Sequence, residues 1–143
     1  MCGIVGITST KKVSASIVNS LRKLEYRGYD SAGIATLENG VIREVKCEGR
    51  VNALENNLSK QKIDGNVGIG HVRWATHGVP STVNAHPHSS DKVSVVHNGI
   101  IENSTILKKL LIKKGYVFKS QTDTEVIVHL ITDYLKKNNL KNS

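Results

Sequence analysis

The chain has 143 residues, which suits a single domain. Apolar residues make up 38% and charged residues 22%, which excludes a disordered chain, and no apolar run approaches the roughly 20 residues that cross a bilayer. The net charge of +8 raises nucleic acid as a partner, but the lysines are scattered and no nucleic-acid-binding motif accompanies them. We therefore expect neither nucleic acid nor a membrane as a partner. Because the N-terminus lacks the pattern of a signal peptide, a cytoplasmic location is expected.

Hydrophobic periodicity and turn residues predict an α+β chain. Apolar residues spaced as on one helix face predict helices at residues 14–24, 51–58, 104–114 and 123–137. Short apolar runs predict strands at residues 3–7, 32–37, 41–46, 67–72 and 93–96. The pair Asn39-Gly40 predicts a tight hairpin turn between two of these strands, whereas residues 76–90 read as a loop. Without a regular βαβ alternation, mostly antiparallel pairing is expected.

The last predicted helix carries two further expectations. A capping box is predicted at its start, with Thr122 as the cap and Glu125 reaching back. Its buried stripe is expected to contain Ile127, Leu130, Ile131 and Tyr134. The stretch from residue 136 to residue 143 is polar and is expected to fray, so the folded core is predicted to span residues 2–135.

The two cysteines stand in different contexts. Cys47 lies in a charged stretch and is interpreted as an incidental residue, and nothing in the chain implies an oxidising compartment that would join it to Cys2. Removal of Met1 would leave Cys2 with both a thiol and a free α-amine, whose reference pKa is about 7.7–8.0. Nucleophile and base would then occupy one residue. On this evidence alone, a buried structural thiol explains Cys2 better than a catalytic one does.

Other residues supply what a thiol needs to cleave an amide, namely oxyanion donors and groups that hold the substrate. The side-chain amide of Asn98 and the N–H of Gly99 are suited to an oxyanion, although Asn-Gly is also a common turn. The fork of Arg73 suits a carboxylate, or else a surface ion pair. Asp123 suits an ammonium, and it equally suits the first turn of a helix. Glutamine presents an amide, a carboxylate and an ammonium together.

Six stretches spread over essentially the whole chain form a recognisable pattern. They are CGIVG at 2–6, LEYRGYDSAG at 24–33, HVRWATHG at 71–78, NAHPH at 84–88, VHNGIIEN at 96–103 and TDTE at 122–125. In this order they resemble the class II glutamine amidotransferases, and in particular the glutaminase domain of the glutamine–fructose-6-phosphate aminotransferase (glucosamine-6-phosphate synthase) family. The amidophosphoribosyltransferase family is the nearest competitor, but it typically has His-Arg-Gly-Gln at residues 26–29 and Tyr-Ser-Thr at residues 74–76.

The resemblance implies a role for each matching residue. Cys2 would be the nucleophile, with its own α-amine as the general base. Asn98 and Gly99 would form the oxyanion hole. Arg73 would bind the carboxylate of glutamine and Asp123 its ammonium.

The resemblance also implies supporting residues. Those that line or support the pocket would be Trp74, Thr76, His77 and His86. Arg27 would position the N-terminal residue, and the loop that carries Tyr29 would close over bound glutamine.

The fold implied by the resemblance is the αββα sandwich of the N-terminal-nucleophile hydrolases, with antiparallel sheets between helices. The family's glutaminase domain is longer than this chain, so residues 1–143 are expected to form a partial domain that lacks its C-terminal part and the sugar-isomerase domains. The implied function is hydrolysis of glutamine to supply ammonia for converting fructose 6-phosphate to glucosamine 6-phosphate, with the sugar step in the absent domains. No cofactor and no metal are implied, and full-length family members are expected to form homo-oligomers.

Two alternatives stand beside this interpretation. The histidines suggest a zinc site, formed by His71, His77, His86, His88 and His97, although their spacing matches no zinc-binding motif. A partial domain is also compatible with a fragment that binds glutamine without turnover, or with an inert one.

Overall fold

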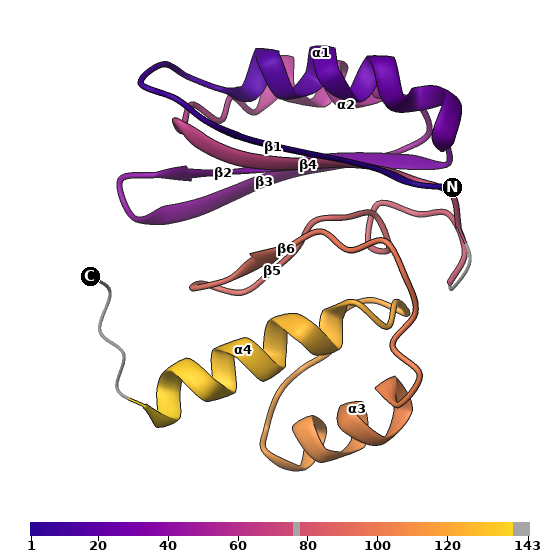
Figure 1. The fold of residues 1–143 in the computed structure, drawn as a ribbon, viewed down its shortest axis with the longest axis vertical. Coiled ribbons are helices and arrows are strands. Elements are labelled where there is room, and N and C mark those ends of the chain that lie inside the picture. Colours follow the sequence, from indigo (N-terminus) through magenta and orange to yellow (C-terminus); the bar gives the residue numbers. More distant parts are fainter. Residues whose placement is uncertain (76–77, 139–143) are drawn as a thin grey trace.

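The computed structural model describes residues 1–75 and 78–138 and arranges them in four layers (Figure 1). Helices α1 (Ser14–Leu24) and α2 (Val51–Lys60) cover a sheet whose strand order is β1 (Gly3–Thr8), β4 (Val67–Arg73), β2 (Ser31–Glu38) and β3 (Val41–Glu48). On the other side of this sheet lie strands β5 (His88–Ser89) and β6 (Ser94–Val95), followed by helices α3 (Ser104–Lys113) and α4 (Glu125–Lys137). The pairs β1–β4, β2–β4, β2–β3 and β5–β6 are antiparallel, so the predicted α+β, αββα architecture is confirmed.

Most predicted elements are present with similar bounds, because their signals are local. The hairpin β2–β3 turns at Asn39 (φ 50°) and Gly40 (φ 78°), and positive φ at both central residues is what a type I′ turn requires. A short 3₁₀ turn, η1 (Glu25–Arg27), follows α1. The strand predicted at 93–96 is shorter in the structure, where it forms β6. Its partner β5 lies within residues 76–90, which were predicted to be a loop.

The main core lies between α1, α2 and the four-stranded sheet. Ile17 and Leu21 of α1 and Leu54 of α2 are fully buried against Ile34 of β2. This packing fixes the sheet as a rigid platform, and β4, with neighbours on both sides, is one of its inner strands.

The predicted buried stripe of α4 is wrong at three of its four residues, whereas Ile127 is half-buried. Leu130, Ile131 and Tyr134 are 38%, 39% and 61% exposed, whereas Val128 and Thr132 are buried. The hydroxyl of Thr132 lies 2.9 Å from that of Ser90, beside β5, so the helix turns its polar Thr132 toward the two-stranded sheet. Because apolar residues occur on both faces of α4, periodicity alone cannot tell which face is buried, and the prediction chose the outer face.

The predicted capping box is also wrong. Helix α4 begins at Glu125, and no side-chain hydrogen bond from Thr124 caps it. The carboxylate of Glu125 accepts hydrogen bonds from the N–H groups of Lys119 (2.8 Å) and Ser120 (2.7 Å) instead of reaching back to Thr122. The Thr122 hydroxyl lies 2.8 Å from Nε2 of His88. Glu125 therefore binds the chain before the helix, and Thr122 binds a residue of β5, in place of the capping-box hydrogen bonds.

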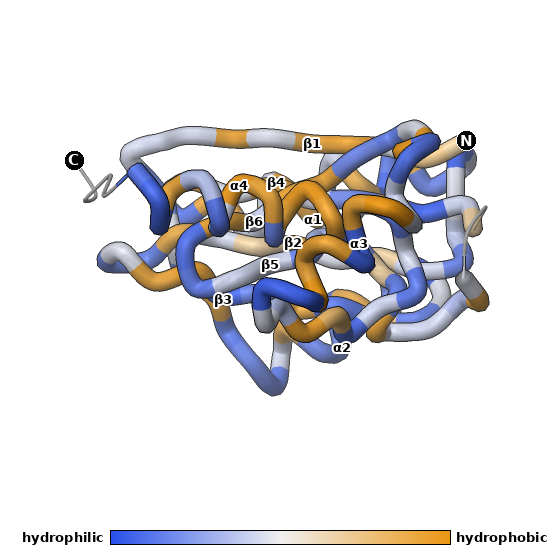
Figure 2. The backbone as a smooth tube through the Cα atoms, turned by 90° about the horizontal axis from the view of Figure 1, so that it is seen from below, coloured by the Kyte–Doolittle hydropathy of each residue, from blue (hydrophilic) through white to orange (hydrophobic). Residues whose placement is uncertain are grey.

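The layer formed by α3 and α4 carries an apolar outer face. Figure 2, viewed from this side, shows orange segments in both helices. Its exposed side chains include Ile106, Leu110, Leu130, Ile131 and Tyr134. Within the described part of the chain, no helix combines the length and apolar character needed to cross a membrane. Helix α4 contains residues 136 and 137 of the stretch predicted to fray, and residues 139–143 lie outside those described.

Candidate active site

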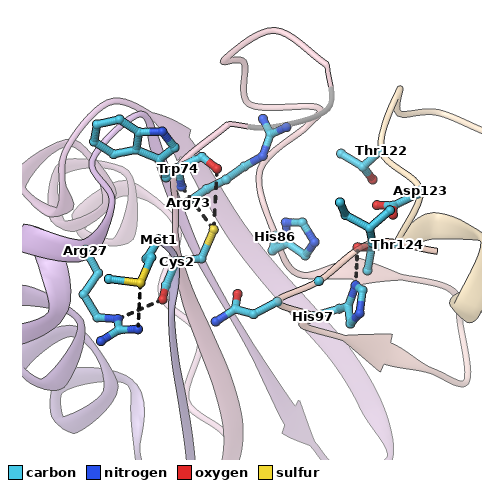
Figure 3. A pocket seen from close by; sticks show the side chains of 13 residues that line it. Met1, Cys2, Arg27, Arg73, Trp74, His86, His97, Thr122, Asp123 and Thr124 are labelled. Atoms are coloured by element: carbon cyan, nitrogen blue, oxygen red, sulfur yellow. Dashed lines mark hydrogen bonds between the residues drawn. The ribbon is translucent and has the colours of Figure 1, made fainter. Parts of the chain in front are cut away.

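A pocket of about 300 Å³ lies where the N-terminus meets the end of β4 (Figure 3). Antiparallel pairing of β1 with β4 places Gly3 opposite Val72, and this register brings Cys2 beside Arg73. The opposite wall comes from the turn after β6 and from the segment before α4. The lining residues named in Figure 3 include Cys2, Arg27, Arg73, Trp74, His86, His97 and Asp123.

Cys2 is held at the pocket wall by the backbone of Trp74 and the side chain of Arg27. The N–H of Trp74 donates to its Sγ atom at 3.2 Å, and Sγ lies 3.6 Å from the Trp74 carbonyl oxygen. The Nε of Arg27 donates to the Cys2 carbonyl at 3.0 Å. Arg27 therefore contacts Cys2, the residue that it was predicted to position. The free thiol of Cys2 faces the pocket.

Asn98 and Gly99 line the same pocket as Cys2. The Oδ1 atom of Asn98 lies 2.8 Å from Nε2 of His71, a residue of β4 that is fully buried. The ring of the preceding residue, His97, lies 3.2 Å from the Thr124 hydroxyl through its Nδ1 atom. These contacts tie the turn after β6 both to the sheet and to the segment that carries Asp123.

Groups of opposite charge occupy the two sides of the pocket. Arg73 is 4% exposed, and its Nη2 atom donates to the carbonyl of Gly78 at 3.3 Å. Asp123 accepts a hydrogen bond from the N–H of Ile101 at 2.6 Å, and Figure 3 shows it across the pocket from Cys2. A ligand that carries both a negative and a positive group matches this arrangement.

The remaining predicted site residues divide into three groups. Trp74 and His86 line the pocket. Tyr29 does not; its ring forms a T-shaped pair with the Trp74 ring at 5.7 Å between centroids, and the guanidinium of Arg50 lies over it at 4.6 Å from its centroid. Thr76 and His77 lie outside the described residues.

Asp30 is a supporting residue to which the sequence interpretation gave no role. Its carboxylate accepts hydrogen bonds from the N–H of Ala75 and the hydroxyl of Ser31, and its own N–H donates to the carbonyl of Arg73 at 3.2 Å. These bonds hold the backbone that contacts Cys2. The motif at residues 24–33 contains Asp30, but no local pattern shows that two of its partners, Arg73 and Ala75, lie more than 40 residues away.

Three buried histidines, His71, His86 and His88, pack together beside the pocket, and His86 lines it. The rings of His71 and His86 stack at 4.3 Å, and those of His86 and His88 meet at 4.6 Å. Burial lowers the pKa of His71 to about 4, although the hydrogen bond with Asn98 opposes the shift. Burial, followed by the charge of Lys46, lowers the pKa of His88 to about 4, and burial with the neighbouring imidazoles lowers the pKa of His86. Among the described residues, no three His, Cys, Asp or Glu side chains are arranged to hold a metal ion.

These histidines predict acid sensitivity of the fold. An unfolded histidine titrates near pH 6.5 and the folded His88 near 4, so between these values the unfolded state binds more protons and acidification favours unfolding. We expect each of His71 and His88 to cost about 2 kcal/mol of stability between pH 8 and pH 5. Urea unfolding at the two pH values measures the loss, and His88→Gln should reduce it. Equal stability at both values would contradict the prediction.

Comparison with known proteins decides the family. The sequence model of a family described as "Glutamine amidotransferase domain" matches residues 56–140, more than half of the chain. The chain belongs to this family. Solved structures agree with the assignment. Glutamine phosphoribosylpyrophosphate amidotransferase from B. subtilis superposes with a TM-score of 0.76 at 30% identity, covering 92% of this chain and 29% of that one.

Curated relatives of this glutamine amidotransferase domain are more similar in sequence. Glutamine–fructose-6-phosphate aminotransferase [isomerizing] of Mesorhizobium japonicum is 56% identical over 137 residues, covering 96% of this chain and 23% of the relative. The Clostridium acetobutylicum protein of the same name is 58% identical over 142 residues, covering 98% and 23%. The resemblance and the N-terminal-nucleophile hydrolase fold are thus confirmed. The chain spans less than a quarter of the length of these relatives.

Proposed function

We propose that this glutamine amidotransferase domain hydrolyses the side-chain amide of glutamine, with Cys2 as the nucleophile. One observation carries the proposal. The Sγ atom of Cys2 shares a pocket of about 300 Å³ with the Asn98-Gly99 turn, with a buried cation, Arg73, and with an anion, Asp123. A thiol, two oxyanion donors and charges matched to an α-amino acid are what cleavage of glutamine needs.

The chemistry follows from these groups. After removal of Met1, the α-amine of Cys2 takes the thiol proton and Sγ attacks the amide carbon of glutamine. The amide oxygen becomes an oxyanion, toward which the Nδ2 group of Asn98 and the N–H of Gly99 donate. The protonated amine then passes its proton to the departing nitrogen, so ammonia leaves and a thioester remains. Water hydrolyses the thioester, releasing glutamate and restoring the thiol.

We assign residues 1–143 the glutamine step alone. The relatives' name, glutamine–fructose-6-phosphate aminotransferase, supports the further proposal that the ammonia serves the conversion of fructose 6-phosphate to glucosamine 6-phosphate. With both glutamine and fructose 6-phosphate supplied, this chain should release ammonia and form no amino sugar. The cytoplasmic location expected of this chain and the homo-oligomeric state expected of full-length family members stay predictions.

A single protein preparation tests the glutamine step. The chain is fused at Cys2 to a removable N-terminal tag, and glutamate and ammonia are measured before and after the tag is cleaved. The proposal is supported if glutamate and ammonia are released in equal amounts after cleavage and not before it. Intact mass confirms that Cys2 is then the N-terminal residue. If circular dichroism shows that the cleaved chain is folded and it still releases no glutamate, the proposal fails. The chain is then a fragment that binds glutamine without turnover, or an inert one.

Gly28 should be needed for activity because another segment passes close to its Cα atom. A Cβ added there would lie 2.6 Å from the carbonyl carbon of Arg73 and 2.8 Å from the nitrogen of Trp74, the donor to Cys2. Gly28→Ala must displace this backbone, and we expect kcat to fall by roughly 10–10²-fold. Steady-state glutaminase kinetics measure the loss. Gly6→Ala is the matched control, since a Cβ at Gly6 meets nothing within 4 Å; equal losses in both variants would contradict the explanation.

A further inference from the structure

We propose that His71 is a positioning residue, which holds the side-chain amide of Asn98 so that its Nδ2 group, rather than its oxygen, faces the substrate. The inference rests on the proposed function, in which Asn98 supplies an oxyanion donor. It starts from the 2.8 Å contact between Nε2 of His71 and Oδ1 of Asn98.

The orientation of the Asn98 amide decides whether it helps or hinders catalysis. Its NH₂ group donates hydrogen bonds, whereas its oxygen only accepts them. With Oδ1 engaged by His71, Nδ2 is the group left for the pocket that Asn98 lines. A rotation of 180° would present the oxygen to a developing oxyanion, and two electron-rich oxygens would repel each other.

His71 is a rigid anchor for this choice. It lies in the inner strand β4, where it is paired with Ile4 of β1 and Gly33 of β2 and is fully buried. Asn98, by contrast, lies in the irregular segment between β6 and α3. The hydrogen bond therefore ties a turn to an inner strand of the four-stranded sheet.

The protonation of the ring supports the same assignment. Burial keeps His71 neutral near pH 7, so only one of its two nitrogens carries a proton. A proton on Nε2 donates to Oδ1 of Asn98, whereas a bare Nε2 would attract the amide NH₂ and turn the oxygen toward the pocket. The tautomer of His71 and the orientation of Asn98 are thus coupled.

Packing alone gives no reason for a histidine here. Among the described residues, Nδ1 of His71 is buried without a hydrogen-bond partner. An unpaired buried polar atom destabilises a fold, so an apolar side chain of similar size would satisfy packing better. What the imidazole adds to this position is polar contact with the turn after β6, namely an interaction with the backbone of His97 and, as the larger of the two, the directed hydrogen bond to Asn98.

Four variants of the full chain test the inference by steady-state kinetics. His71→Leu removes the donor, His71→Gln keeps an N–H group, and each is compared with Asn98→Ala and with the double variant. We expect His71→Leu to lower kcat by about 10–30-fold with KM changed less than about threefold, and His71→Gln to retain most of kcat. In the Asn98→Ala background, His71→Leu should cost less than about twofold more. If the losses in kcat of His71→Leu and Asn98→Ala multiply in the double variant, His71 does not act through Asn98. Equal losses in His71→Leu and His71→Gln would likewise show that His71 serves only packing.

A second measurement separates this inference from the proposed function. Nitrogen-15 NMR of the histidine rings reports the tautomer of His71 in the unmutated chain, and we expect the proton on Nε2 at pH 7. A bare Nε2 would overturn the inference whatever the activity. If the chain releases no glutamate but carries this tautomer, with an Asn98 NH₂ signal that changes in His71→Leu, the positioning stands and the proposed function fails. Thermal melting of each variant confirms that it is folded.

Discussion

Replacing Cys2 with alanine should lower glutamine hydrolysis by the processed chain by about 10⁴-fold or more, because no other thiol of the described residues lines the pocket. The thiol at the pocket wall is the attacking atom of the proposed reaction, and its loss leaves only binding and the oxyanion donors. The rate of glutamate release, measured with the tag removed, gives the size of the effect. Substantial activity in Cys2→Ala would exclude Cys2 as the nucleophile.

The second cysteine provides a matched control. Cys47 is 2% exposed in β3, and burial raises the pKa of its thiol. Cys47→Ala should therefore leave turnover nearly unchanged. A glutamine analogue that carries an alkylating group should label Cys2 and spare Cys47, as peptide mass analysis will show. Labelling of Cys47 at a comparable rate would mean that the reagent does not report on the pocket.

The elements that the sequence predicted well are those whose signals are local. The turn at Asn39-Gly40 and the helix at 14–24 depend on residues next to one another in the chain. The face of α4 was predicted wrongly because apolar residues occur around the helix, and contacts such as that of Thr132 with Ser90 decide which side is buried. No period in the sequence contains that information.

In the candidate site, too, some residues could be predicted from the sequence and others depend on tertiary contacts. Cys2, Arg73, Asn98 and Asp123 were selected by their chemistry and by the family pattern, and the structure brings all four to one pocket. The bond between His71 and Asn98 joins residues 27 positions apart, through a strand register and a turn that the sequence does not determine. Supporting residues of this kind can be identified only once the chain is folded.

The assignment of the two charged residues leads to a prediction about substrate analogues. If Asp123 binds the ammonium of glutamine, Asp123→Asn should lower kcat/KM for glutamine by about 10²-fold, since hydrogen bonds to charged groups contribute about 1.5–3 kcal/mol. The asparagine oxygen can still accept the N–H of Ile101, so the local fold is preserved. For glutaramate, which is glutamine without its α-amine, the same substitution should cost less than about threefold.

A substitution of Arg73 provides the reciprocal test. Arg73→Lys keeps the charge but loses the planar fork, so it should impair glutamine and glutaramate alike, because both carry the carboxylate. The analogue 4-aminobutanamide has an amine and no carboxylate, so Arg73 has no group to bind in it. Arg73→Lys should therefore change its slow hydrolysis little. An Asp123→Asn variant that loses equal activity toward glutamine and glutaramate would show that Asp123 supports the loop at Ile101 rather than the substrate. The pattern across variants and analogues, more than any single loss, therefore decides which charge holds which end of glutamine.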